Sequence, residues 1–488
     1  MPLRIERKPA QPLVGPEVIE HARAAQQLWA RKPLKHRLAL LRRARRLIAV
    51  TSVELARSVP CEQPGALHRT LADTLAAEVL PFAEACRFLE REAPFILAPQ
   101  RLSDLTRPFW LRRVSAHTTR EPLGVVLILA PANYPLFLPG VQALQALAAG
   151  NAVLWKPADG GVTAAEALRQ ILVGCGLDPS LLQVLPPSPE AGTEAIAAGV
   201  DKVFLTGSST TGAAVLAQLA GTVTPAVVEL SGCDAVFVLP GASAERVVAA
   251  LTFGLRMNGS ATCMAPRRLF LVGDHPGLTT AMLKAFRTLP AVALPPRIKA
   301  QLLDLFEDAR RRGAEVELGG AVEAMQYAVV SNANAGMRIT QSDVFAPVLS
   351  VFEVPDIETA VDTHALSPYA LTAAIFGPEK DAQALAAKLP VGTVLVNDLI
   401  VSTADPRLSF GGRNASGFGM TRGREGLLEM TVLKTVLTQR NHDTRAYQPT
   451  TAAHLPLFAA YLQTAHGGSW RSRWDGLRKL LQAAARFR

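Results

Sequence analysis

The 488-residue chain has few cysteines and no long apolar run. Its five cysteines are scattered, odd in number and without a CxxC pair or a neighbouring histidine, which argues against a disulfide framework and against a metal site. No uninterrupted apolar stretch reaches the about eighteen residues of a membrane-spanning helix. Residues 1–30 lack a basic start followed by an apolar stretch and a cleavage site. We therefore expect free thiols in a cytoplasmic protein.

Charged residues are also scarce, at 19% of the chain, whereas 49% are hydrophobic. This balance excludes disorder as the main state and allows a large buried interior. We find no internal repeat and no low-complexity linker. Because the chain exceeds the size of one ordinary domain, we expect two large domains.

The formal net charge of +10 is concentrated in two places. Residues 34–46 fit the solvated face of an N-terminal helix. The second cluster lies in the tail and comprises Arg471, Arg473, Arg478, Lys479, Arg486 and Arg488. Beside it, roughly on one helical face, are Trp474, Leu477, Leu480, Leu481 and Phe487.

This tail pattern predicts a short basic amphipathic helix. Residues 466–488 then either lie on an anionic membrane, dock on a protein partner, or pack against the body of the chain. No recognised nucleic-acid-binding module accompanies the charge, so we do not expect nucleic acid as a partner.

Residues 121–240 alternate short apolar runs with helical stretches, which is typical of βαβ units and a parallel sheet. Strands are expected at 125–130, 152–155, 182–185, 202–205 and 226–230, and helices at 137–149, 163–174 and 213–220. Asn133, Lys156, Gly207 and Glu229 all fall at the ends of these strands. Ligands bind beyond the carboxyl ends of such strands, so the four residues should share a cleft. A second α/β region is expected at 235–400, with strands at 235–239, 269–272, 328–330, 348–354, 373–376 and 393–396.

Two residues of this region indicate covalent chemistry. Cys263 follows Glu229 by thirty-four residues. A cysteine can hold a carbonyl carbon as an adduct, and a carboxylate can activate the water that releases it. Taken singly, a buried cysteine is a small hydrophobe and a glutamate at a strand end is solvated. The turn Gly207-Ser208-Ser209-Thr210-Thr211-Gly212 starts a helix whose amides could face a pyrophosphate, although a capped helix start explains it equally.

Seven motifs in order carry a family resemblance. They are Pro131-Ala132-Asn133-Tyr134-Pro135, Lys156-Pro157-Ala158-Asp159, the Gly207 turn, Val228-Glu229-Leu230-Ser231-Gly232, the segment 258–268 around Cys263, Asp343-Val344-Phe345-Ala346-Pro347 and the segment 410–417 that begins Phe410-Gly411-Gly412. The series resembles the aldehyde dehydrogenase superfamily from about residue 20 to about residue 437.

The resemblance implies an α/β fold with two Rossmann-like open parallel-sheet domains, for cofactor and catalysis, and a small projecting oligomerisation sheet. The cofactor domain would take residues 1–102 and 121–230, and the catalytic domain 231–412. The arm and its return would be 103–120 and 413–438, leaving 439–488 as a C-terminal extension. The exposed edge of the arm predicts a homodimer or homotetramer.

The resemblance also implies residue roles. Cys263 would attack an aldehyde, the Asn133 amide and the Cys263 backbone N–H would hold the oxyanion, and Glu229 would activate the water that hydrolyses the thioester.

Cofactor contacts are implied as well. Gly207 and Ser208 would contact the cofactor phosphates, and Lys156 and Asp159 the adenine ribose. The Asp159 carboxylate favours NAD, with NADP still accommodated.

The sequence departs from the family pattern at several positions. Asp343 replaces the Glu that contacts the nicotinamide ribose, while Phe345 remains available to pack on the nicotinamide. Ser260-Ala261 replaces the Gly-Gln that usually precedes the cysteine, and Ser231 replaces the first Gly of the Glu-Leu-Gly-Gly motif. Both changes are expected to bring side-chain bulk near the cleft. Ala346 replaces a Gly, which requires that its φ not be positive. Phe410 either lines the substrate funnel or is a core aromatic.

The leading hypothesis is a hydrolytic aldehyde dehydrogenase. An acylating relative that passes the acyl group to coenzyme A would more often lack the general-base Glu. A non-catalytic scaffold is favoured only by the altered 343 and 260–261 positions. A long-chain apolar aldehyde would suit a membrane-seeking tail.

Overall fold

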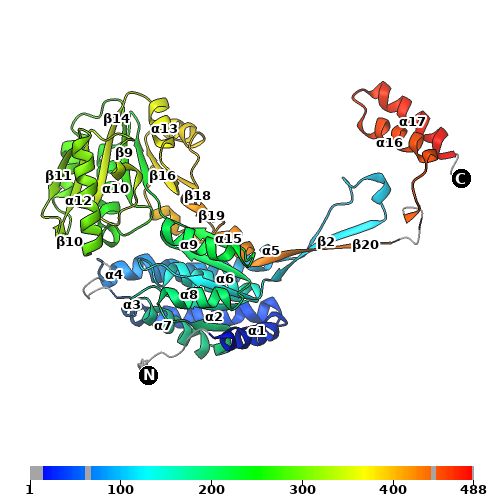
Figure 1. The fold of residues 1–488 in the computed structure, drawn as a ribbon, viewed down its shortest axis with the longest axis horizontal. Helices are drawn as coiled ribbons and strands as arrows, with labels where there is room; N and C mark the ends of the chain where they lie inside the picture. Colours follow the sequence, from blue (N-terminus) through cyan, green and yellow to red (C-terminus); the bar gives the residue numbers. More distant parts are fainter. Residues whose placement is uncertain (1–14, 61–67, 441–443, 445–446, 486–488) are drawn as a thin grey trace. The chain divides into compact units, whose positions relative to one another are not determined.

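The computed structural model describes residues 15–60, 68–440, 444 and 447–485 (Figure 1). Cys61, Arg486, Phe487 and Arg488 lie outside these residues. The chain forms two compact units, Met1–Pro99 with Thr119–Lys434, and Gln100–Thr118 with Thr435–Arg488.

A six-stranded sheet organises the first part of the larger unit, in the order β19-β7-β6-β3-β4-β5. Its strands are β3 (Val125–Leu129), β4 (Ala152–Lys156), β5 (Leu182–Val184), β6 (Lys202–Thr206), β7 (Ala226–Glu229) and β19 (Gly417–Phe418). Neighbours run parallel, except that the edge strand β19 is antiparallel to β7. The five predicted strands are therefore confirmed to within a residue at each end.

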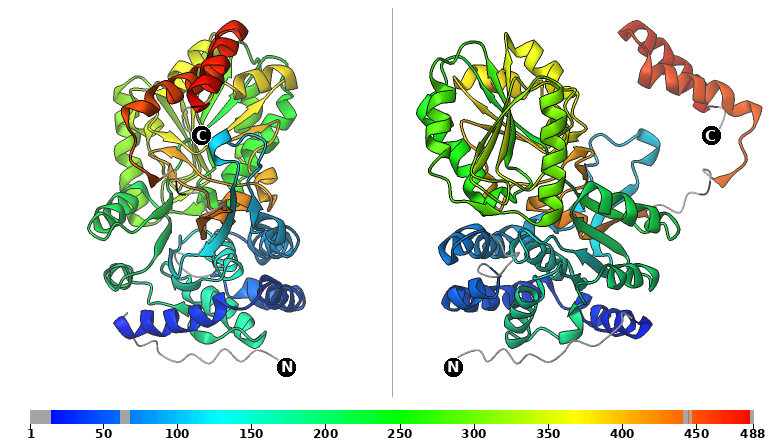
Figure 2. Two further views of the ribbon diagram at one scale, coloured as in Figure 1. Left: turned by 90° about the vertical axis from the view of Figure 1, so that its right-hand side faces the viewer. Right: turned by 60° about the vertical axis from the view of Figure 1, so that its left-hand side comes forward.

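Helices cover both faces of this sheet (Figures 1 and 2). The chain runs outward from β3 to β5 and then returns to β6 and β7. Because such crossovers are right-handed, α6 (Phe137–Ala149) and α7 (Val162–Gly174) lie on one face, and α8 (Pro189–Ala197) and α9 (Ser209–Ala220) on the other. The α9 helix begins four residues earlier than predicted, because the Ser208 hydroxyl caps it by accepting the Thr211 N–H at 3.1 Å.

The N-terminal helices complete this half. They are α1 (Pro16–Ala30), α2 (Leu34–Val50), α3 (Ser52–Arg57), α4 (Leu71–Thr74), the π-helical η1 (Leu75–Val79) and α5 (Leu80–Ile96). Helices α2 and α5 pack against α6. The basic segment 34–46 lies within α2, as expected for a helix with one solvated face.

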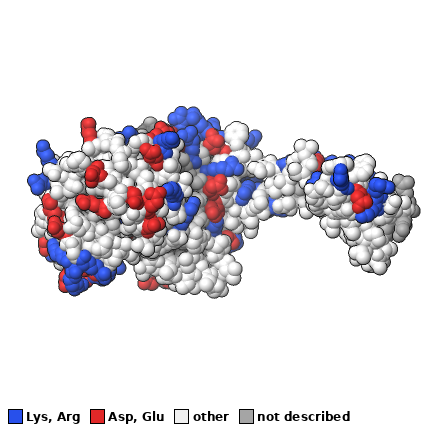
Figure 3. All heavy atoms as spheres, turned by 90° about the horizontal axis from the view of Figure 1, so that it is seen from above, with Lys and Arg blue, Asp and Glu red and all other residues white. Residues whose placement is uncertain are grey.

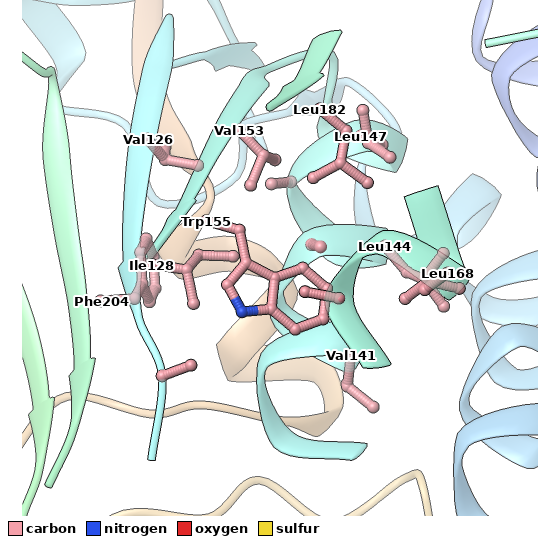
Figure 4. Close-up of a cluster of buried hydrophobic side chains, with 14 of the residues drawn as sticks. Val126, Ile128, Val141, Leu144, Leu147, Val153, Trp155, Leu168, Leu182 and Phe204 are labelled. Carbon is pink, nitrogen blue, oxygen red and sulfur yellow. The ribbon is translucent and has the colours of Figure 1, made fainter. Parts of the chain in front are cut away.

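The core beneath these helices is built around Trp155, which is fully buried on β4 (Figure 4). The strands contribute Val126, Ile128, Val153 and Phe204, while Leu144 and other aliphatic residues of α6 and α7 face them. Strands that are apolar on both faces need helices on both sides, which explains the near-continuous apolar runs in the sequence.

A seven-stranded sheet forms the second part of the larger unit, in the order β11-β13-β14-β9-β8-β16-β17. Its strands are β8 (Asp234–Val238), β9 (Pro266–Val272), β11 (Glu315–Gly319), β13 (Tyr327–Ser331), β14 (Val348–Val354), β16 (Thr372–Phe376) and β17 (Thr393–Val396). The helices include α10 (Ala244–Arg256), α11 (Leu278–Phe286), α12 (Pro296–Arg311), α13 (Ile357–Ala365) and α14 (Glu379–Ala386). Helix α15 (Gly423–Glu429) instead packs against α5 and α6 of the first part. Only β11 among these strands is antiparallel to its neighbour. All six predicted strands are present, and the fold is α/β with two Rossmann-like sheets, as predicted.

The remaining elements are a three-stranded sheet and a helical hairpin. The sheet has the order β1-β2-β20, with β1 (Gln100–Arg101), β2 (Val114–Pro122) and β20 (Thr431–Gln439). The hairpin of the smaller unit pairs α16 (Leu455–His466) with α17 (Trp470–Ala484). Helix α17 confirms the predicted tail helix, whereas α16 was not predicted. Over the ranges that the structure describes, no helix has the length and apolar character needed to cross a bilayer.

Candidate functional site

The carboxyl edge of the six-stranded sheet brings the predicted residues together. Lys156 ends β4 and Glu229 ends β7, while Gly207 directly follows β6 and Asn133 lies in the loop between β3 and α6. The strand order reverses between β3 and β6, so Asn133 and Gly207 flank the switch point at which open sheets bind ligands.

Cys263 is positioned by an unusual backbone segment. Three consecutive residues before it, Asn258, Gly259 and Ser260, have φ values of 53°, 58° and 66°. A side chain at Gly259 would place its Cβ 2.8 Å from the Cβ of His68, so this position needs a glycine. The left-handed turn delivers half-buried Cys263 just before β9 begins.

Asn133 is tied to the cysteine segment through hydrogen bonds. Its Nδ2 donates to the Ala261 carbonyl at 3.0 Å, and the Asn258 Nδ2 donates to the Asn133 carbonyl at 3.0 Å. A carboxamide carries two hydrogens. The second Asn133 hydrogen has no partner among the described residues, so it can serve a further acceptor.

A buried carboxylate holds the loop that carries Asn133. The Glu78 Oε2 atom accepts the backbone N–H groups of Leu136 and Phe137, both at 2.8 Å. Its Oε1 atom pairs with buried Arg69, whose guanidinium lies 5.6 Å from the Tyr134 ring centroid. Two independent anchors therefore hold the loop in place.

Glu229 is buried, with 2% of its surface exposed. Its Oε2 accepts the Thr421 hydroxyl at 2.9 Å. Burial raises the pKa of the Glu229 carboxyl, and nearby Arg422 and the Thr421 hydrogen bond oppose that rise. A carboxyl with a raised pKa is the kind that can both take and return a proton near neutral pH.

Arg422 supplies the positive charge beside both candidate catalytic residues. Its Nη1 donates to the Thr403 carbonyl at 2.8 Å, and its guanidinium lies 4.7 Å from the Phe410 ring centroid. Burial and the carboxyl groups of Glu229, Asp234 and Asp343 raise the pKa of the Cys263 thiol well above its ordinary value, and Arg422 opposes them. The thiol therefore needs a proton acceptor before it can attack.

Cys263, Glu229 and Arg422 all line one pocket with a volume of about 590 Å³. Its wall is largely apolar and includes Leu138, Phe253, Leu255, Met264, Leu289 and Val292. Phe410 also lines it and is buried, which is compatible with either interpretation of this residue. Asn133 is not among the lining residues.

The residues assigned to the cofactor lie apart from this pocket. Burial lowers the pKa of the Lys156 ammonium group, and Asp159 and Glu190 act in the opposite direction. Asp159 and Ser208 are exposed. The Gly207 N–H already donates to the Glu229 carbonyl at 3.0 Å, so it is not free for a phosphate.

The departures from the family pattern meet at one buried arginine. Arg267 lies 3.7 Å from Asp343 Oδ1 and donates to Ser260 Oγ and to the Ala346 carbonyl, both at 2.8 Å. Burial raises the pKa of Asp343 to about 6, although Arg267 and Ser231 lower it. The expectation of bulk near the cleft is wrong for Ser260, which is fully buried against Arg267.

Two further positions of that motif can be placed. Ala346 does not have a positive φ, so the replacement of glycine there costs no backbone strain. Phe345 is half-buried and does not line the pocket.

The family model for the aldehyde dehydrogenase family matches residues 15–436. The chain belongs to this family. As a member, it is an oxidoreductase of the aldehyde group. It is 28% identical over 445 residues to a 4,4'-diapolycopene aldehyde oxidase of Methylomonas sp, covering 88% of this chain and 83% of the relative. It is 31% identical over 442 residues to an NADP(+) succinate-semialdehyde dehydrogenase of Deinococcus radiodurans, covering 86% of this chain and 89% of the relative.

Solved structures of aldehyde dehydrogenases share the fold. The Mycobacterium tuberculosis aldehyde dehydrogenase in complex with NAD+ superposes with a TM-score of 0.79 at 22% identity, covering 89% of this chain and 91% of that one. The NADP-dependent glyceraldehyde-3-phosphate dehydrogenase of Bacillus halodurans, in complex with NADP, gives 0.80 at 25% identity, covering 88% and 93%.

Sequence reasoning missed several residues of this aldehyde dehydrogenase site, including Glu78, Arg267, Thr421 and Arg422. Charged and hydroxyl side chains are mostly exposed, and none of these residues stands in a motif that marks it as buried. Within the described ranges, no group of three or more His, Cys, Asp or Glu side chains could hold a metal ion.

Proposed function

We propose that this chain oxidises an apolar aldehyde to a carboxylic acid with NAD or NADP, through a covalent adduct on Cys263. The observation that carries the proposal is the shared pocket of Cys263 and Glu229, in which a nucleophile and a carboxyl of raised pKa face one largely apolar cavity.

The first step is attack of the Cys263 sulfur on the aldehyde carbon. Because the pKa of the thiol is raised, its proton passes to the Glu229 carboxylate, directly or through water. The resulting thiohemiacetal oxyanion accepts hydrogen bonds from the second Asn133 amide hydrogen and the Cys263 backbone N–H.

The later steps release the acid. A nicotinamide cofactor held by Lys156 and Asp159 would supply the acceptor for the hydride that leaves the thiohemiacetal carbon. Glu229 returns its proton to solvent and then deprotonates the water that attacks the thioester, which frees the Cys263 sulfur. Glu229 beside Cys263 favours this hydrolysis over transfer to coenzyme A.

Lys156 and Asp159 fit a role in binding the adenine ribose. The Lys156 ammonium group is partly buried at the sheet edge, and it has no hydrogen-bond partner among the described residues. Such a group is suited to a ligand hydroxyl. Gly207, Ser208, Asp343 and Phe345 stay proposed contacts of the phosphates and nicotinamide. The Gly207 N–H already donates to the Glu229 carbonyl. Gly207 would therefore contribute by letting a phosphate come close to a backbone that carries no side chain.

The substrate is proposed to be apolar because of the pocket wall. An aliphatic or aromatic tail would replace water against Leu138, Phe253 and Leu289. Burying such a tail contributes about 25 cal/mol per Å² of apolar surface.

The test is reduction of NAD and NADP with short, aromatic and long-chain aldehydes. Cys263→Ser should abolish turnover. The matched control is Cys175→Ser, which changes a half-buried thiol at the end of α7 and should leave turnover intact. Turnover in Cys263→Ser equal to that of the wild type would refute the covalent route, and no turnover with any aldehyde would refute the activity.

We also propose that the chain is a cytoplasmic homodimer or homotetramer. Support comes from β20, which exposes Val432, Leu433 and Leu437 at 49%, 51% and 67%. Exposed apolar strand edges need a partner. Light scattering behind size exclusion should give twice or four times the chain mass, and a monomer at micromolar concentration would contradict this assembly.

A further inference from the structure

Helix α17 carries an apolar stripe along one side. Trp470, Trp474, Leu477 and Leu481 follow one another at intervals of four, three and four residues, which places them on one helical face. Trp470, Trp474 and Leu481 are 74%, 61% and 66% exposed. We call these four residues the tryptophan stripe.

The opposite side of α17 packs against α16. A Cβ at Gly476 would lie 2.6 Å from the Thr464 backbone nitrogen, so the two helices approach closely there. Ala460 and Ala483 are buried, at 3% and 7% exposure. Small residues therefore line the contact between the two helices, whereas Trp470, Trp474 and Leu481 of the stripe stay exposed.

Cations border the tryptophan stripe on both sides. At 100° per residue, Arg471 and Arg478 fall on one flank and Arg473 on the other. The Arg471 guanidinium lies 5.6 Å from the Trp470 ring centroid. Figure 3 shows basic side chains on this part of the chain beside a wide uncharged area.

Negative charge is nearly absent from the hairpin. Asp475 is the one carboxylate in residues 447–485, and it already pairs with Lys479 at 2.6 Å. It also accepts the Gln463 amide at 3.1 Å. Asp475 also acts on Arg478, whereas Arg471 and Arg473 have no carboxylate partner on the two helices.

We propose that the tryptophan stripe docks on an anionic lipid bilayer. Indole rings are favoured at the boundary between headgroups and acyl chains, and arginines keep their charge at the phosphates while their stems lie along the apolar phase. Apolar burial and cation attraction together give stable but reversible binding, which neither signal gives alone. The hairpin lies beyond the residues 15–436 that match the family, so this function is additional to aldehyde oxidation.

The experiment is co-sedimentation of the full chain with phosphatidylcholine vesicles, with and without phosphatidylglycerol, combined with tryptophan emission. We expect binding to the anionic vesicles, a blue shift of the emission and loss of binding in high salt. Trp470→Ala/Trp474→Ala and Arg471→Gln/Arg478→Gln should each weaken partition by about tenfold or more.

Two matched controls separate the stripe from general surface effects. Phe95→Ala removes an aromatic residue that is 75% exposed on α5, and Arg424→Gln removes an exposed cation on α15. Both should bind vesicles like the wild type. All variants should oxidise a short soluble aldehyde at the wild-type rate, and Cys263→Ser should still bind vesicles, which separates this proposal from the proposed activity.

Three outcomes would overturn the proposal. The first is absence of wild-type binding to anionic vesicles. The second is binding that neither the tryptophan nor the arginine pair alters. The third is a fall in oligomer mass on Trp470→Ala/Trp474→Ala without any wild-type vesicle binding, which would assign the stripe to a second copy of the chain.

Discussion

The Thr421 hydroxyl donates a hydrogen bond to the Glu229 carboxylate at 2.9 Å and lies 3.1 Å from the Phe410 carbonyl oxygen. Thr421 is 192 positions from Glu229 and 11 positions from Phe410 in the sequence. The contact joins Glu229, the proposed general base on β7, to the segment that carries Phe410 in the pocket wall. Because it favours the charged form, it limits the rise in the pKa of Glu229 that burial causes.

Thr421→Val should move the acidic limb of the rate profile to higher pH. The pKa of Glu229 is already raised, and loss of a donor to the carboxylate raises it further. The base is active above that pKa, so activity at the acidic end should fall by about threefold to tenfold while the alkaline plateau is kept. Steady-state rates across pH provide the measurement. A limb that stays in place or shifts to lower pH would contradict the role of Glu229.

Arg422→Gln should make Cys263 less reactive. Arg422 is the group that opposes the raised pKa of this thiol, so its removal leaves less thiolate at a given pH. Alkylation of Cys263 by iodoacetamide, followed by peptide mass spectrometry, should slow by about tenfold. Arg424→Gln, two residues along at an exposed position, is the control. Equal alkylation rates in both variants would show that Arg422 does not act on the thiol.

Phe410→Ala should separate long substrates from short ones. Phe410 lines the pocket, so its removal takes away apolar contact with the tail of a substrate. For a long-chain aldehyde, kcat/KM should fall by about tenfold to a hundredfold, with little change for acetaldehyde. A uniform loss across chain lengths would instead indicate that Phe410 acts by supporting Arg422, which stacks on it.

Asp159→Asn should shift cofactor preference toward NADP. The exposed Asp159 carboxylate would repel a 2′-phosphate, whereas an amide would not. The ratio of kcat/KM for NADP to that for NAD should rise by about tenfold. Glu190→Gln, the other carboxyl that acts on Lys156, tests whether general charge removal suffices. An equal rise of this ratio in both variants would contradict a specific contact between Asp159 and the adenine ribose.

Much of the fold could be predicted from local pattern. The helix at 137–149 and the strands at 348–354 and 393–396 have the predicted bounds. The first two are apolar runs buried almost throughout, whereas the edge strand at 393–396 is mostly half-buried. Helix α16 was missed, since its sequence LPLFAAYLQTAH is apolar nearly all round and carries no amphipathic signal.

Site residues at the ends of strands could be predicted from the sequence. The residues from distant parts of the chain that contact them could not. Lys156 and Glu229 follow from the strand pattern. The partners of Glu229 come from 192 and 193 residues away, a separation that no local pattern encodes. The left-handed backbone before Cys263 was signalled only in part. Asn258 and Gly259 are residue types that adopt positive φ readily, whereas Ser260 gives no such signal.

The covalent mechanism is tested most directly by mass spectrometry of the Glu229→Gln protein during turnover with an aldehyde and NAD. This variant lacks the acceptor of the Cys263 proton as well as the group that activates the water. We therefore expect one slow burst of NADH at alkaline pH, where solvent takes the thiol proton. The variant should then accumulate a single acyl group on the Cys263 peptide. Absence of an acyl group from Cys263 during NADH formation, or its presence on another residue, would contradict the covalent mechanism.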